Sequence, residues 1–573
     1  MCRRLFVLIS LIWTVSGRRA RVAAGPSRAN SLDGHTVLGV GLKKKLHSSQ
    51  AKLHRPLGVL AMFFLASHHA PGFIHSSSSS QSLTQSPIMS SGPLRGIREK
   101  GTLSSREIPS LVSRQSVSGG TTVSIPDSAP PWDTLTNSVG STDAGQRLND
   151  ALELRSKGLG PAHTDALLRL FDAKSEDEVR VTLYRDDAAW CPYCQKVWLL
   201  LEEKRIPFKV RKINMRSYGD KPPEFLRKVP GGLLPAIELD GQLMTESLPI
   251  MQVLDQTFEA GPQMVPPPGS KEREQAQNLL QLERRLFGDW CSLTFQPGKG
   301  IMGFSEQSFL NTLREVDKAL LATPGPWFLG GDAPSLVDLQ YISHVERMIA
   351  SVLYWKGLKI RGTGDFKGLD AWLAAFEERS AYLATKSDFY THVMDIPPQY
   401  GPGWSVDEAE EVAKVIDGRG DSWKLPMELE KLQTVEPLAP LQWNGEEDAR
   451  HEAAWKLISN HKNVVKFAAR GAGSPGERQF QAPLADPYAK PAKEFIPTVD
   501  VALRHVASAL LTGVEQASDS AKADFAAIVE GGDAHRLKKC LAYLRDRVGV
   551  PRDMSQAAAL QLRSTLNWAI DLL

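Results

Sequence analysis

The chain has 573 residues, which is too long for a single hydrophobic core and predicts two or three domains. Apolar residues make up 42% of it and charged residues 23%, so most of the chain is expected to fold. Five cysteines make a poor disulfide framework for this length, and only one pair lies close together in sequence. This usage argues against a disulfide-stapled secreted protein and indicates a reducing compartment with a redox or catalytic pair.

The positive charge of the chain is confined to its N-terminal end. Residues 1–97 hold twelve Lys or Arg and one acid, a net charge of +11, whereas the whole chain carries +3 and the remainder therefore −8. The folded body thus offers no basic footprint for nucleic acid, and no such partner is expected. Two apolar runs, Leu5 to Val15 and Leu57 to Ala66, are too short to span a bilayer comfortably, so no stable membrane anchor is expected.

Two short apolar runs separated by a basic, acid-poor segment resemble the bipartite presequence of algae with complex plastids. We therefore expect residues 1–97 to be a targeting presequence that directs import into a plastid (chloroplast). A single ordinary transit peptide is the alternative, and the mitochondrion is a less favoured destination. Residues 98–177 are expected to form a linker with two short helices, Gln146 to Lys157 and His163 to Phe171, because residues 98–140 are rich in Ser, Thr, Gly and Pro.

The most informative stretch is Cys191-Pro192-Tyr193-Cys194, between a predicted strand from Val181 to Tyr184 and a predicted helix from Gln195 to Lys204. Cys191 falls just ahead of the helix, and Pro192 occupies its first turn, where a missing N–H costs little. A thiol at a helix N-terminus meets free amides and the positive end of the helix dipole, which stabilise the thiolate. The spacing therefore predicts a nucleophilic or redox cysteine at position 191.

Two other interpretations of these cysteines were weighed. A buried structural thiol is disfavoured by the position at a helix start. A zinc site needs four ligands, and the remaining candidates, Cys291 and Cys540, stand alone without partners at zinc-finger spacing, so no metal is expected. Cys194 faces the same side of the helix turn as Cys191 and could resolve a mixed disulfide formed there.

The elements that follow complete a β-α-β-α-β-β-α order. A strand is predicted over Phe208 to Ile213 and another over Leu233 to Leu239, and Asp240-Gly241 is a strong signal for a two-residue hairpin. A further short strand leads to a helix that opens at Thr245 to Ser247 and runs to Phe258. This order, with a cysteine at the first turn of the first helix, is typical of a thioredoxin-like domain.

The sequence resembles the cysteine-type glutathione transferases, which place a thioredoxin-like domain before an all-helical one. The matching pieces are Cys191 to Cys194, Leu199 to Lys204 with Ile206-Pro207, Leu234 to Ile237, Glu246-Ser247, and Phe328 to Asp338 in the helical half. Ser335 and Asp338 have the spacing of a capping box, which has a structural role. Long extensions on both sides of the module resemble the iota class of photosynthetic organisms.

The resemblance sets the expected fold class and domain organisation. An α/β thioredoxin-like, glutathione-binding domain spans 178–262, and an all-α glutathione-transferase C-terminal domain spans 268–390. Helical apolar spacing over Glu447 to Arg470, Thr498 to Glu515, His535 to Val548 and Met554 to Leu572 predicts an additional helical domain at 400–573. Its scattered histidines, His451, His461, His505 and His535, are interpreted as surface or satisfied core residues.

The same resemblance implies a glutathione site. Pro235 would be a cis-proline beside Cys191, and the Leu234 backbone would pair with the cysteinyl part of glutathione. Glu246 and Ser247 would bind the γ-glutamyl group, although they could simply cap a helix. Lys221 would hold the glycine carboxylate, with a solvated lysine as the alternative.

The implied activity is that of a glutathione-dependent thiol transferase or deglutathionylase. The Cys191 thiolate would attack a disulfide, a glutathionylated substrate or a small electrophile, and glutathione, the co-substrate, would regenerate the thiol. Dehydroascorbate reductase is a close variant, and a non-catalytic protein that binds a ligand or a partner on the same scaffold is the rival. A membrane-associated isomerase with a similar CPxC module would need an anchor. A homodimer is possible.

Overall fold

The computed structural model describes residues 127–476 and 483–573. The predicted presequence, 1–97, and most of the serine-rich part of the predicted linker lie outside these residues.

One mixed five-stranded sheet forms the first part of the fold. Its strands are β1 (Leu168–Arg169), β2 (Val181–Asp186), β3 (Phe208–Ile213), β4 (Ala236–Leu239) and β5 (Gln242–Thr245), in the order β1-β3-β2-β4-β5. β2 pairs parallel with β3 and antiparallel with β4, which turns into β5 at Asp240 and Gly241. Both turn residues have positive φ, as a type I′ hairpin requires, so the predicted hairpin is confirmed.

The predicted helix over His163 to Phe171 is wrong, because this segment contains the edge strand β1. Leu168 lies opposite Lys209 in an antiparallel pairing with β3. Arg169 points inward and forms a buried ion pair with Glu202, with 2.9 Å between Nη2 and Oε2. A buried arginine carries no apolar signal, so the alternation typical of a strand is hidden from a hydrophobicity pattern.

Helices cover both faces of the sheet. α4 (Pro192–Glu203) and α6 (Ser247–Thr257) pack against one face, where Leu183, Ile237 and Leu254 join the main hydrophobic cluster. The short helix α5 (Pro223–Lys228) lies on the other face, where Phe225 packs against Tyr184. This arrangement is thioredoxin-like, as the order of elements predicted.

An all-helical domain follows the sheet. Its helices are α7 (Lys271–Thr294), α8 (Phe304–Leu321), α9 (Leu336–Lys356), α10 (Lys367–Glu377), α11 (Ser380–Leu383) and α12 (Phe389–Tyr400). Nearly every residue of α9 is buried. The predicted capping box at its start is present, since Asp338 accepts the Ser335 N–H at 2.8 Å. The carboxylate also accepts the Phe328 N–H and the Trp372 indole N–H, which confirms its structural role.

The remaining chain forms an additional helical region, as predicted. Its helices are α13 (Glu410–Asp417), α14 (Leu429–Val435), α15 (Glu446–Ser459), α16 (His461–Ala468), α17 (Ile496–Thr512), α18 (Val514–Glu530), α19 (Ala534–Arg545) and α20 (Gln556–Asp571). The single helix predicted over Glu447 to Arg470 is interrupted at Asn460, whose φ of −123° and ψ of 21° are not helical. The helix predicted over Thr498 to Glu515 corresponds to α17, which ends at Thr512 before Gly513, and the separate helix α18 was not predicted.

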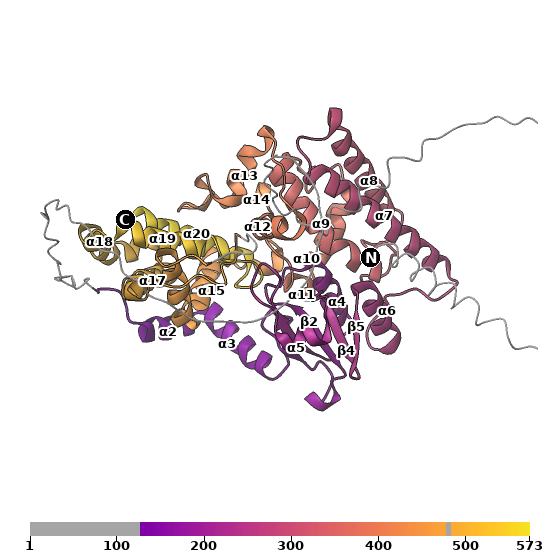
Figure 1. The fold of residues 1–573 in the computed structure, drawn as a ribbon, viewed down its shortest axis with the longest axis horizontal. Helices are drawn as coiled ribbons and strands as arrows, with labels where there is room; N and C mark the ends of the chain where they lie inside the picture. Colours follow the sequence, from indigo (N-terminus) through magenta and orange to yellow (C-terminus); the bar gives the residue numbers. More distant parts are fainter. Residues whose placement is uncertain (1–126, 477–482) are drawn as a thin grey trace, which may run out of the picture. The chain divides into compact units, whose positions relative to one another are not determined.

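The C-terminal helices enclose a core that also includes residues from before the sheet. α2 (Trp132–Gly140) and α3 (Asp143–Ser156) lie beside α15 and α17 (Figure 1). The Trp132 indole donates to Asp500 at 2.8 Å, and the buried Leu135 joins the same hydrophobic cluster as α17 and α20. The linker prediction is therefore wrong over Trp132 to Gly140, which forms α2, whereas the helix predicted over Gln146 to Lys157 is confirmed as α3.

One histidine of this core matches the sequence-based expectation. His505 is 1% exposed and its Nε2 lies 2.7 Å from Asp524 Oδ2, so it is a satisfied core histidine. Among the described residues, one helical segment, Lys493–Thr512, is long and apolar enough to cross a membrane, with a mean hydropathy of 1.2. Most of it is buried inside the protein, as expected of a core helix.

Candidate active site

The site is built around the junction of β2 and α4. Cys191 occupies the N-cap position of α4 and Pro192 its first turn, as the spacing predicted. Cys191 is partly exposed, whereas Cys194, one turn further on, is 1% exposed. The two thiols thus occupy different environments only three residues apart.

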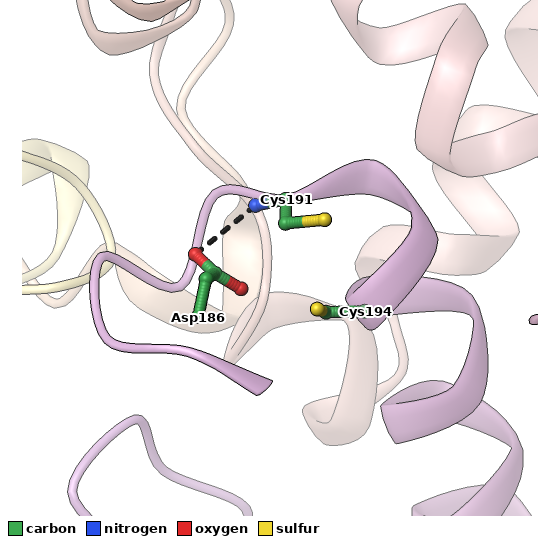
Figure 2. Close-up of side chains that lie close together, drawn as sticks. All are labelled: Asp186, Cys191 and Cys194. Atoms are coloured by element: carbon green, nitrogen blue, oxygen red, sulfur yellow. Dashed lines mark hydrogen bonds between the residues drawn. The ribbon is translucent and has the colours of Figure 1, made fainter. Parts of the chain in front are cut away.

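Asp186 caps the turn that carries Cys191. It is the last residue of β2 and is 1% exposed. Its Oδ2 accepts the backbone N–H of Trp190 at 2.6 Å and that of Cys191 at 3.1 Å. A carboxylate oxygen of Asp186 and the two cysteine sulfur atoms all lie within 4.8 Å of one another (Figure 2).

Sequence reasoning missed Asp186. The signal was an acidic residue at the inner end of a buried strand, five positions before Cys191. It was obscured by the neighbouring Arg185 and Asp187, which make the segment look like a solvated loop. In the structure Arg185 is itself buried, and its guanidinium donates to the Asp186 carbonyl at 2.7 Å.

The helical domain holds the same turn from the other side through Trp190. The Trp190 indole donates to His392 Nδ1 at 3.2 Å. The Arg347 guanidinium lies 4.7 Å from the Trp190 ring and donates to the Trp190 carbonyl oxygen. The position of Cys191 is therefore set jointly by β2, α9 and α12.

Burial separates the chemistry of the two cysteines. It raises the pKa of Cys194 well above its usual value, with a hydrogen bond to Cys191 and the charge of Cys191 adding to the effect. Cys194 is therefore a neutral thiol near pH 7. Cys191, at the helix start and in contact with solvent, is the more accessible sulfur.

The predicted glutathione-site residues fall into two groups. The Leu234–Pro235 peptide bond is cis and leads directly into β4, and Lys221 is close enough for both cysteines and Asp186 to act on its charge. Burial lowers the pKa of Lys221, the three acidic groups oppose this, and its Nζ donates to the Asn214 carbonyl at 2.8 Å. Glu246, with φ of 73°, is the N-cap of α6, and Ser247 is its first residue.

The side chains of Glu246 and Ser247 form no hydrogen bond or ion pair with any other residue that the structure describes. They stand at the start of α6, whereas Lys221 lies close enough to the cysteines for their charges to act on its pKa. The structure thus brings Lys221 to the cysteine pair and leaves Glu246 and Ser247 at a helix N-terminus, a suitable place for a carboxylate.

Aromatic side chains of the helical domain approach the CPYC turn. Tyr400 lies 6.1 Å from Phe287 and is stacked with Phe295 at 6.2 Å, between ring centroids. Desolvation raises the pKa of Tyr193 to about 12, with the charge of Cys191 adding to it and a hydrogen bond to Tyr400 opposing it.

Asp186, Cys191 and Cys194 also offer three atoms of types that bind metals. A closed zinc site needs four ligands, and no fourth His, Cys, Asp or Glu joins this group within residues 127–476 and 483–573. The geometry therefore matches a cysteine pair with a supporting carboxylate better than a structural metal centre.

A thioredoxin-like domain with a cysteine at the start of α4, a cis-proline just before β4 and an all-helical domain after the sheet defines a glutathione-transferase type of protein. Comparison with known proteins agrees. Family models described as "Glutathione S-transferase, N-terminal domain" and "Glutathione S-transferase, C-terminal domain" match residues 190–257 and 278–375. Glutathione S-transferase L3 of Arabidopsis thaliana is 31% identical over 205 residues, which are 35% of this chain and 79% of that protein. The chain belongs to the glutathione S-transferase family.

Two other similar proteins carry names that refer to dehydroascorbate reductases. Glutathione S-transferase DHAR3, chloroplastic, of Arabidopsis thaliana is 34% identical over 170 residues, covering 30% of this chain and 59% of that protein. The crystal structure of Chlamydomonas reinhardtii dehydroascorbate reductase is 22% identical, with a TM-score of 0.29, over 36% of this chain and 93% of the other. The two family models match residues 190–257 and 278–375, so the helices from α13 onward lie outside the matched ranges.

Proposed function

We propose that this protein is a glutathione-dependent thiol transferase and deglutathionylase that uses Cys191 as its nucleophile. The observation that carries the proposal is the contrast within the CPYC turn: Cys191 is a partly exposed N-cap residue, whereas Cys194 is buried and neutral. The free amides of a helix N-terminus stabilise a thiolate at Cys191. A thiolate, rather than the hydroxyl of tyrosine- or serine-type transferases, favours disulfide exchange over conjugation.

The reaction would proceed by two exchanges. The Cys191 thiolate attacks the sulfur of a glutathionylated substrate, the substrate leaves as a thiolate, and a Cys191–glutathione disulfide forms. A glutathione thiolate then attacks the glutathione sulfur of that disulfide, releases oxidised glutathione and restores Cys191. The substrate is reduced, two glutathione units become one disulfide, and the electrons balance.

Five residues would hold glutathione in this reaction. The Leu234 backbone next to Pro235 would pair with the cysteinyl part, and Lys221, close to both cysteines, would take the glycine carboxylate. Glu246 would meet the γ-glutamyl ammonium, and Ser247 with the first amides of α6 would bind its carboxylate. In this assignment glutathione extends from the start of α6 to Lys221, and its thiol lies beside Cys191.

Dehydroascorbate reduction is a second candidate. It is favoured by the similarity to the relative named DHAR3 and by its chemistry, because it begins with attack by the same Cys191 thiolate. By the same similarity to a relative described as chloroplastic, and from the basic N-terminal segment, we propose import into a plastid. We also propose a homodimer, for which the molecular mass in solution is the direct test.

The proposal is tested by intact mass spectrometry of the chain from about residue 98 after exposure to oxidised glutathione. We expect one adduct, about 305 Da by disulfide-exchange chemistry, to accumulate on Cys194→Ser, while Cys191→Ser carries none. The Cys291→Ser variant is the matched control, because burial raises the pKa of Cys291 to about 12 and makes it a poor nucleophile. Absence of an adduct from both the wild type and Cys194→Ser would reject the enzyme and favour a ligand- or partner-binding protein.

A further inference from the structure

Asp186 has a second oxygen that its capping role does not use. Both backbone N–H groups of the turn, from Trp190 and Cys191, donate to Oδ2. The other oxygen lies on the side of the carboxylate that faces the two sulfur atoms (Figure 2). With one oxygen of the group within 4.8 Å of both sulfurs, the carboxylate borders the space between Cys191 and Cys194.

A cap alone does not require a carboxylate at this position. An asparagine oxygen would accept the same two N–H groups, and burying a neutral amide costs less free energy than burying a charge. Asp186 is 1% exposed, and none of the ion pairs among the described residues includes its side chain. A buried carboxylate beside two thiols is therefore suited to a task that an amide cannot perform, namely accepting a proton.

Cys194 needs such an acceptor. The thiolate, not the thiol, attacks a disulfide, and burial keeps Cys194 protonated. Its sulfur is 1% exposed and surrounded by the site, so water has little access to remove the proton. One carboxylate oxygen of Asp186 lies within 4.8 Å of both cysteine sulfur atoms. A direct hydrogen bond or one bridging water can span this distance, so Asp186 can receive the proton.

We propose that Asp186 is the proton acceptor for Cys194 when that thiol attacks the Cys191–glutathione disulfide. The step rests on the proposed function and adds a second route for the mixed disulfide. The Cys194 proton moves to Asp186, a Cys194–Cys191 disulfide forms, and the Cys191–glutathione bond breaks. The departing glutathione thiolate then takes up a proton, so Cys194 is oxidised and glutathione is reduced. Two further glutathione molecules reduce the Cys191–Cys194 disulfide.

Other charged groups around Asp186 shape the step without replacing it. The Arg185 guanidinium is directed to backbone oxygens, and the charges that interact with Asp186, Cys194 or both come from Arg185, Cys191, Lys221 and Asp395. Lys221 would favour both the carboxylate and the thiolate, while Asp395 opposes ionisation of its neighbours. Lys221 is also the residue proposed to hold glutathione, so the positive charge is present where the leaving thiolate forms.

The test compares Asp186→Asn with Asp187→Asn. The first variant keeps an oxygen for the two N–H groups but cannot accept the proton, and the second makes the same change at a half-exposed neighbour that pairs with Lys212 at 3.6 Å. After mixing with oxidised glutathione, rapid acid quench and intact mass report two rates: adduct formation on Cys191 and its conversion to the internal disulfide. We expect Asp186→Asn to form the adduct within about twofold of the wild-type rate but to convert it about a hundredfold more slowly at pH 7.

The pH profile separates proton transfer from mere positioning. In the wild type, conversion should be independent of pH wherever the carboxylate is charged, whereas in Asp186→Asn it should rise tenfold per pH unit as free Cys194 deprotonates. The wild-type profile alone decides the matter if the variant does not fold. A wild-type rate that rises tenfold per unit, or equal losses of adduct formation and conversion in Asp186→Asn, would overturn the assignment. If Cys194→Ser forms no adduct and the wild type forms neither adduct nor internal disulfide, the proposed function itself fails and this inference fails with it.

Discussion

Cysteines in two helices of this molecule have opposite characters. Cys191 is the N-cap of α4 and is partly exposed, whereas Cys540 lies in the middle of α19 and is fully buried. Burial raises the pKa of Cys540 to about 11. The two thiols thus differ in their position along the helix and in their exposure, and these two properties determine which thiol can react.

The polar groups buried in the two regions differ in the same way. In the C-terminal region they have charged partners: His505 pairs with Asp524 at 2.7 Å, and Arg563 pairs with Asp388 at the start of α12 at 2.7 Å. Around Cys191, the buried Asp186 instead accepts backbone N–H groups and faces sulfur. Paired buried charges maintain a fold, and a buried carboxylate beside thiols is available for proton transfer.

The largest effect that this comparison predicts is on thiol reactivity. Alkylation by iodoacetamide at neutral pH, followed by peptide mass mapping, should label Cys191 rapidly and Cys540 only after unfolding. Replacing Cys191 by Ser should remove both the rapid labelling and glutathione-dependent turnover. Replacing Cys540 by Ser should leave both intact, and rapid labelling of Cys540 in the folded protein would contradict the comparison.

The next effect concerns the ion pair between the helical regions. Arg563 of α20 and Asp388, the N-cap of α12, are 1% and 3% exposed. Arg563→Ala leaves a buried carboxylate unpaired and should lower the free energy of unfolding by about 3–5 kcal/mol. Arg147→Ala, which breaks the more exposed pair with Asp448, should cost at most about 1 kcal/mol. Urea unfolding of both variants gives the two values, and similar losses would refute the distinction.

The sequence predicted the thioredoxin-like module well because its signals are local. A Cys-Pro pair before an apolar helix, the Asp240-Gly241 hairpin and the Ser335–Asp338 capping box each depend on a few neighbouring residues. The cis-proline was reached through the family resemblance. Placement of the glutathione-binding side chains stays a prediction, because it depends on a ligand and not on a local pattern.

The failures of prediction share one physical cause: the residues concerned are buried, although the local sequence is polar and does not indicate burial. The edge strand β1 is hidden by the inward Arg169, and α2 by a Ser- and Thr-rich sequence that packs on α15 and α17. Asp186 belongs to the same class, since only tertiary structure brings it to Cys194. Polar residues that become buried through long-range partners are where sequence patterns lose their information.

A smaller effect, on the pH dependence of stability, is expected where the thioredoxin-like domain, the all-helical domain and the C-terminal helical region meet. Asp395 of α12 accepts the Tyr218 hydroxyl at 2.8 Å, and Arg552 lies 5.8 Å from the Tyr218 ring. Burial raises the pKa of Asp395 from 3.8 to about 7. Between these values the folded state binds more protons than the unfolded state, so the free energy of unfolding should fall as pH rises towards 7, by on the order of 3 kcal/mol.

Asp395→Asn should remove this slope, because an amide does not titrate. Denaturant unfolding at pH 5, 6 and 7 measures it, and the comparison between the two proteins cancels the titration of other groups. An unchanged slope in Asp395→Asn would show that Asp395 is charged in the folded protein across this range.

The smallest predicted effect tests whether the C-terminal region influences the glutathione site. Tyr488, beyond α16, donates its hydroxyl to Asp220 at 2.7 Å, and Asp220 directly precedes Lys221. This exposed hydrogen bond contributes little to stability, but it restrains the loop that holds a proposed ligand of the glycine carboxylate. Tyr488→Phe should therefore raise KM for glutathione about twofold while leaving kcat unchanged. Lys221→Gln should raise the same KM more strongly, and because Tyr488 acts through the loop that carries Lys221, adding Tyr488→Phe to Lys221→Gln should have no further effect. Independent, multiplicative effects of the two substitutions would show that the C-terminal region does not act through Lys221.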